Sequence, residues 1–168
     1  MKAALAFLLL GTFALGQTSP ATGALRMELR ASFVQIGMNQ QEIVFSVFFR
    51  SPDKTTTIWN ALWWGASTGL YLRVFDSSGH EVQHTVVPID PMPPDLNGRG
   101  ALISIGGKAF AGFDSQFATR DLFPHPGSYT VKCVYSPPLR RDYFTGHTIW
   151  VREDGTIMSA PVSIVVAE

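Results

Sequence analysis

The most regular strand pattern in the chain is residues 127–135, GSYTVKCVY. Apolar or aromatic side chains occupy every second position, and Ser128, Thr130 and Lys132 alternate with them. The first set is Tyr129, Val131, Cys133 and Tyr135. A period of two residues is that of a strand with one buried face. The overlapping segment PHPG at residues 124–127 contains the proline and glycine typical of a turn. These residues therefore predict a strand that is entered through a tight turn.

Strand-like segments recur along the chain, with turn residues between them. We predict further strands at residues 25–33, 43–49, 55–62, 70–75, 80–87, 101–105, 148–151 and 156–166. The polar sequence DSSG at residues 76–79 is expected to close a hairpin. No segment has a convincing helical period. About eight or nine strands, with turn signals every 8 to 12 residues or so, favour an all-β, antiparallel β-sandwich.

Two segments depart from the regular pattern. Residues 108–117 carry phenylalanine at positions 110, 113 and 117, a spacing that suits neither a clean strand nor a helix interrupted by Gly112. We expect an irregular or bulged strand there. Pro161 lies inside the last predicted strand, and proline has no N–H to donate to a sheet, so it indicates an edge strand or a bulge.

The N-terminal segment predicts export. Residues 1–16 combine one charge, Lys2, with an apolar run and a small-residue exit, which is the pattern of a secretory signal peptide. Residues 17–24 are expected to form a flexible leader, and residues 25–168 a single β-sandwich domain. No later apolar stretch approaches the roughly 20 residues that span a bilayer, so we expect no membrane insertion after signal cleavage. The predicted location is secreted or periplasmic.

Charge and cysteine content narrow the functional classes. The chain has 13 basic and 13 acidic residues, and this balance predicts no nucleic-acid partner. Cys133 is the only cysteine, so no disulfide can form within the chain, and the signal cleavage region lacks the cysteine of a lipoprotein anchor. The neighbours of Cys133, Val131 and Val134, favour a buried thiol over a disulfide between two chains.

The segment PGSYTV, residues 126–131, resembles the penultimate strand of immunoglobulin-like and macroglobulin-like modules of exported bacterial proteins. Residues 154–164, DGTIMSAPVSI, are similar to the final strand of the same modules. The resemblance implies an immunoglobulin-like β-sandwich and carries no functional residue. It also implies that Tyr129 forms a tyrosine corner, with its hydroxyl bonded to the backbone near residues 122–124. The antibody arrangement differs, because Tyr129 precedes Cys133 by four residues and no partner cysteine exists.

A weaker similarity concerns bacterial proteinase inhibitors with a β-sandwich fold. In these, a D-x-x-G-x-x-V hairpin precedes a P-G-x-Y strand, and residues 76–82 and 126–129 follow that order. The resemblance implies inhibition through an exposed loop. Residues 88–100 hold four prolines and two glycines and are the loop we expect to enter a protease cleft.

The sequence predicts no enzyme, no metal site and no cofactor. The closest histidines, His80 and His84, would lie roughly 13 Å apart on a strand, too far to share an ion. The oxygen-bearing residues of the proline-rich loop lack the spacing of a calcium loop. No nucleophile elbow, phosphate-binding loop or H-E-x-x-H motif is present, so we assign no catalytic residue.

Three tryptophans form the candidate binding surface: Trp59, Trp63 and Trp64. Adjacent residues of a strand point to opposite faces, so Trp63 and Trp64 cannot both enter one core unless the segment is twisted, bulged or covered. An exposed tryptophan can stack on a sugar or anchor a partner protein; the alternative is a core position. The prediction is thus a non-catalytic binding or accessory module for an unknown protein or glycan, with proteinase inhibition as the alternative.

Overall fold

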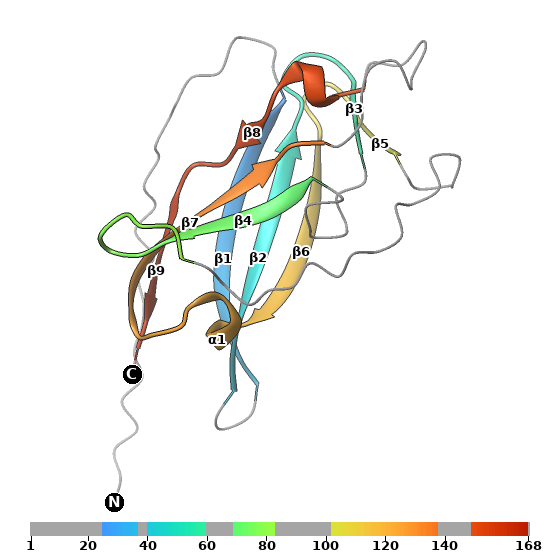
Figure 1. Ribbon diagram of the computed structural model, residues 1–168. Helices are drawn as coiled ribbons and strands as arrows, with labels where there is room; N and C mark the ends of the chain where they lie inside the picture. The colour runs from blue at the N-terminus through green and yellow to red at the C-terminus, as the bar shows by residue number, and fades with distance from the viewer. Residues whose placement is uncertain (1–24, 37–39, 60–68, 83–101, 138–148, 168) are drawn as a thin grey trace, which may run out of the picture.

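The computed structural model describes residues 25–36, 40–59, 69–82, 102–137 and 149–167 (Figure 1). This part of the chain contains nine strands, one short α-helix, α1 (Thr119–Leu122), and one 3-10 helix, η2 (Arg152–Asp154). The strands are β1 (Arg26–Ile36), β2 (Gln40–Arg50), β3 (Thr56–Trp59), β4 (Leu70–Phe75), β5 (Leu102–Ile105), β6 (Phe110–Ala118), β7 (Gly127–Tyr135), β8 (Ile157–Met158) and β9 (Val162–Val166). The all-β prediction is confirmed, whereas α1 is a helical turn that the sequence did not reveal.

Two antiparallel sheets form the layers of a sandwich. The first has the order β1-β2-β6, and in the second β7 pairs with β4 on one side and with β8 and β9 on the other. A two-stranded ribbon, β3-β5, completes the described strands. Figure 1 shows β4 and β7 crossing over β1, β2 and β6, which is the facing of two sheets across a core.

The core follows directly from the alternation of side chains along the strands. On β2 every second residue is fully buried, as are most of the predicted inward residues of β7, and one apolar cluster joins both sheets. The β2 set is Ile43, Phe45, Val47 and Phe49. Phe49 and Tyr135 meet across the core, with their ring centroids 5.0 Å apart. Burying each such side chain contributes about 1.5–3 kcal/mol, so these rows hold the two layers together.

The prediction of an irregular strand at residues 108–117 was wrong. β6 pairs with β2 without a slip, from Arg50 opposite Phe110 to Glu42 opposite Ala118. The phenylalanines divide between the two faces of this strand: Phe113 is buried in the core, whereas Phe110 points outward and is exposed. Gly112 also belongs to the regular strand, where it lies opposite Phe48.

The last strand has the predicted bulge. Val134 pairs with Met158 and Val131 with Val162, so three steps along β7 match four steps along the partner. Ser159 secures the extra residue: its N–H donates to the Cys133 carbonyl, and its Oγ accepts from the Cys133 N–H, both at 2.9 Å. Pro161 lies between β8 and β9, where no ladder bond is required.

The tyrosine corner forms one residue later than predicted. The Tyr129 hydroxyl donates to the His125 carbonyl at 2.7 Å and accepts from the His125 N–H at 3.4 Å.

The predicted hairpin after β4 is reduced, in the described residues, to a turn and a bridge between Phe75 and Glu81. Residues 83–87 of that prediction lie outside the described part of the chain.

Candidate binding surface

Trp59 lies in a second, smaller core cluster rather than on the surface. Its side chain is 2% exposed and packs with Ile149, Val151 and Leu102. Its backbone N–H donates to the Tyr135 hydroxyl at 3.1 Å, which links this cluster to the main core. Trp63 and Trp64, like the predicted inhibitory loop at residues 88–100 and the signal segment, lie outside the described residues. Of the three candidate tryptophans, only Trp59 lies in the described residues, and its side chain is buried in a core cluster.

The surface that does combine exposed aromatic and charged side chains is the outer face of the β1-β2-β6 sheet. Strand register aligns its side chains in three neighbouring rows, each with one residue from β1, β2 and β6. The rows are Arg26–Arg50–Phe110, Glu28–Phe48–Gly112 and Arg30–Ser46–Asp114. We call these nine residues the Phe–Arg face.

Two phenylalanine rings form the apolar part of this face. Phe110 is 62% exposed, and its ring packs edge-on against Phe48 with 5.9 Å between centroids. Gly112 makes room for this arrangement, because a Cβ at that position would lie 2.9 Å from Cδ1 of Phe48. Phe110 differs from a single exposed apolar side chain because its ring and that of Phe48 form one contiguous apolar patch rimmed by charged residues, which is a feature of interaction surfaces.

Two arginines lie against these rings. The Cζ atom of Arg30 is 5.1 Å from the Phe48 ring centroid, and that of Arg50 is 6.0 Å from the Phe110 centroid. Glu28 holds both guanidinium groups, with Arg30 Nε at 2.7 Å and Arg50 Nη2 at 3.8 Å from its carboxylate oxygens. Exposed pairs of this kind contribute at most about 1 kcal/mol to stability. Their effect here is to favour positions of the two guanidinium groups beside the rings.

Charge is unevenly distributed over the Phe–Arg face. Arg26, Arg30 and Arg50 outnumber Glu28 along β1 and β2, whereas the β6 edge carries Asp114. Among the described residues, Asp114 forms no ion pair. The row Arg30–Ser46–Asp114 therefore has a cation at one edge of the sheet, an anion at the other and a small side chain between them.

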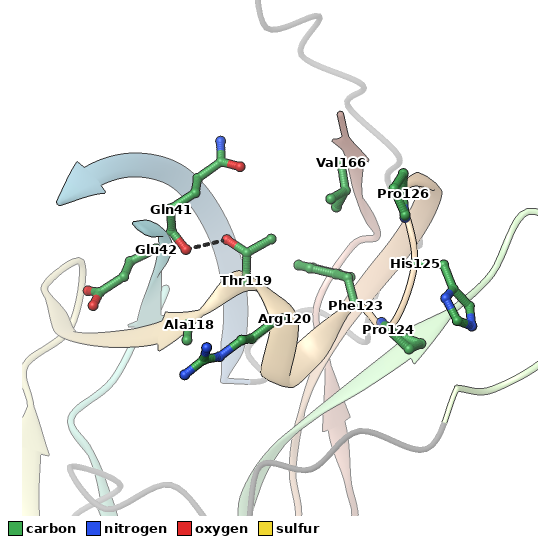
Figure 2. Close-up of a pocket in the computed structure, with 10 residues that line it drawn as sticks. All are labelled: Gln41, Glu42, Ala118, Thr119, Arg120, Phe123, Pro124, His125, Pro126 and Val166. Atoms are coloured by element: carbon green, nitrogen blue, oxygen red, sulfur yellow. Dashed lines mark hydrogen bonds between the residues drawn. The ribbon is translucent and has the colours of Figure 1, made fainter. Parts of the chain in front are cut away.

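A separate pocket of about 260 Å³ lies beside α1, at the end of the sandwich (Figure 2). Figure 2 shows the Phe123 side chain extending toward Thr119, with Val166 above it in the view. The buried Thr119 hydroxyl is already satisfied, since it donates to the Gln41 carbonyl at 2.8 Å. Arg120 and His125 are exposed at the rim and point away from each other. These polar side chains do not converge on one point, as the polar groups of a ligand site do, so we do not assign the pocket a function.

The buried titratable groups have the chemistry of a core. Burial raises the pKa of the Cys133 thiol and of the Tyr135 phenol, so both stay protonated at neutral pH. A protonated, inaccessible thiol is not a nucleophile, and the predicted burial of Cys133 is confirmed. Among the described residues, no three histidine, cysteine or carboxylate side chains gather where they could bind a metal ion.

No protein-family model matches this chain, and a search of curated proteins found no relative. Within the described segments, no helix has the length and hydropathy needed to cross a membrane. Sequence reasoning missed the Phe–Arg face. The residue that could have indicated this surface in the sequence is Phe48. It is an aromatic side chain at an outward position of β2, whose other face is already apolar.

Proposed function

We propose that this protein is an exported, non-catalytic module of immunoglobulin-like topology, and that its Phe–Arg face binds a partner protein. The observation that carries the proposal is the pair of the exposed Phe110 ring and the half-buried Phe48 ring, with the guanidinium groups of Arg50 and Arg30 lying over them. Aromatic residues and arginine are the side chains most enriched at protein interfaces and at their energetic centres. Preoriented guanidinium groups also reduce the entropy lost on binding.

The immunoglobulin-like assignment has two supports. The strand orders β1-β2-β6 and β4-β7-β9 match those of the two sheets of such domains, with β7 as the penultimate strand. The Tyr129 corner at the start of β7 is a second feature that these domains share. Export is supported by the signal-peptide pattern of residues 1–16.

A protein fits this surface better than a small ligand does. Sites for small ligands are concave, whereas the Phe–Arg face follows the surface of a sheet. Its nine residues come from three adjacent strands, so a partner would contact it as one continuous patch. A glycan would have to bind mainly by stacking on Phe110, the more exposed of the two rings.

Site-specific photo-cross-linking in cells that export the protein tests this proposal. A photoreactive phenylalanine analogue is placed at Phe110 or, as the matched control, at Val165, which is 66% exposed on the opposite sheet. We expect a discrete protein adduct from position 110 and none from position 165. Equal adducts from both positions, or none from position 110, would contradict the proposal. Adducts from position 110 that glycosidase treatment removes would assign the face to a glycan instead.

A further inference from the structure

We propose that the partner of the Phe–Arg face is a second copy of this chain, bound face to face about a two-fold axis parallel to β2. This inference rests on the proposed function and names the partner for the same surface. It follows from the arrangement of charges in the row Arg30–Ser46–Asp114, which is complementary to itself under that one rotation.

The geometry of the rotation decides which residues meet. A two-fold axis that lies between two facing sheets and runs along β2 keeps each row at its level and exchanges the edges of the sheet. β1 of one copy then faces β6 of the other, while β2 faces β2. Such an interface is isologous, so every contact between different residues occurs twice.

In the charged row, this arrangement places Arg30 of each copy opposite Asp114 of the other. Two equivalent ion pairs form, and each uses the Asp114 carboxylate that has no ion pair among the described residues. The small Ser46 lies on the axis between them, where close approach is needed. A two-fold axis across the strands would instead set β6 against β6, which carries no cation, so Asp114 would gain no ion pair at any level of the axis. The charges therefore select one orientation of the two copies.

The neighbouring rows are compatible with the same axis. Phe48 meets its own symmetry mate, beside the space left by Gly112, and Arg26 faces the exposed ring of Phe110. The unfavourable contact is Arg50 with its own mate. Its guanidinium group already leans toward the Phe110 ring and is held by Glu28, which lessens the repulsion.

Glu42 is the other charged residue on the outer face of β2 that meets its mate under this rotation. It lies at the far end of the strand, opposite Ala118 and away from the Phe–Arg face. Sheet twist separates the two layers there, so the repulsion between the two carboxylates is weak.

The size of the surface predicts a weak dimer. The two outer strands are about 10 Å apart, and the Phe–Arg face extends along them over the five residues from Phe110 to Asp114, or about 17 Å. With the side chains that overhang these edges, the footprint is about 300 Å² for each copy and falls well below the roughly 800 Å² typical of stable complexes. We therefore expect a dissociation constant above about 1 μM and a dimer that is populated only at high concentration.

Sedimentation velocity of the exported protein, from about 10 μM to about 1 mM, tests the inference. The wild-type sedimentation coefficient should rise with concentration. Arg30→Asp and Asp114→Arg should each remain monomeric, because each places like charges in both ion pairs. An equimolar mixture of the two variants should dimerise again, because position 30 of one and position 114 of the other then carry opposite charges. Lys132→Asp, on the opposite sheet, is the control that should behave like wild type.

Restoration by mixing is the decisive result, since two misfolded or merely destabilised variants would not restore each other. A wild-type protein that stays monomeric at about 1 mM, or a mixture that stays monomeric, would overturn the inference. The cross-linking experiment separates this failure from that of the proposed function. An adduct from position 110 at twice the mass of the chain supports both proposals. An adduct with a different protein overturns the dimer and leaves the binding function standing.

Discussion

Gly69 and Gly79 offer a matched test of how closely the chain packs at the start of β4. Both have left-handed backbone conformations, with φ of +74° and +82°. A Cβ added at Gly79 would have no described atom within 4 Å, so Gly79→Ala introduces only the conformational penalty. At Gly69 the same Cβ would overlap the Ser136 carbonyl oxygen and lie 2.7 Å from its carbonyl carbon. The pair therefore separates backbone conformation from steric overlap.

The expected magnitudes follow from these distances. A left-handed alanine costs about 1–2 kcal/mol, and this applies to both variants. Overpacking against rigid backbone adds about 1–3 kcal/mol at Gly69 only. The Ser136 N–H donates to the Gly69 carbonyl at 2.7 Å, so the two segments cannot separate without losing a hydrogen bond. We expect Gly69→Ala to lower the free energy of unfolding by about 2–5 kcal/mol and Gly79→Ala by about 1–2 kcal/mol.

Urea denaturation monitored by far-UV circular dichroism and tryptophan fluorescence gives both free energies. For a domain of this size, the difference of about 1–3 kcal/mol between the variants corresponds to roughly 2–12 °C in Tm. The gain from a less flexible unfolded chain is the same for both substitutions and cancels in the comparison. If Gly69→Ala proved no less stable than Gly79→Ala, the close approach of β4 to the segment after β7 would be wrong.

Two further predictions concern the core. Tyr129→Phe should lower the free energy of unfolding by about 1 kcal/mol, because it removes the hydroxyl that bonds to both backbone groups of His125; a urea midpoint equal to that of wild type would exclude a stabilising corner. Stability should stay level at neutral pH and fall above about pH 8.5, because burial raises the pKa of Cys133 and Tyr135 in the folded state, and unfolding then releases protons. Measuring the midpoint of thermal unfolding from about pH 7 to about pH 11 checks this. In Cys133→Ser, the pH at which stability begins to fall should move up toward the ordinary pKa of tyrosine.

Much of the fold could be predicted from the alternation of apolar and polar residues along the strands alone. The bounds of β4 and β7 agree with the predicted ranges, because a two-residue period covers β4 and most of β7 and turn residues mark the ends of both strands. The strand at β6 was predicted, but as irregular, because its period is masked: Phe110 and Gly112 lie on the outer face, where a polar residue was expected, and they interrupt the pattern. The reason for this exception is the Phe48 ring on the neighbouring strand, which a local pattern cannot show.

The candidate surface was less predictable than the fold. The three rows of the Phe–Arg face bring together residues from separate parts of the sequence, and only the register of β1, β2 and β6 aligns them. Trp59 was a candidate for exposure on the basis of its size and its neighbours. Its burial depends on Ile149 and Val151, which lie far along the chain, so composition alone could not place it.

The bulge at Ser159–Pro161 also affects how this protein can associate with itself. In the described structure, β8 and β9 pair only with β7, so their other side presents backbone groups that a foreign strand could extend. The bulge divides this edge of the sheet into two short strands, β8 with two residues and β9 with five, and Pro161 between them has no N–H to donate. Neither strand is long enough to template stable growth of fibrils. The proline that interrupts the last strand thus protects the molecule from polymerising along this edge.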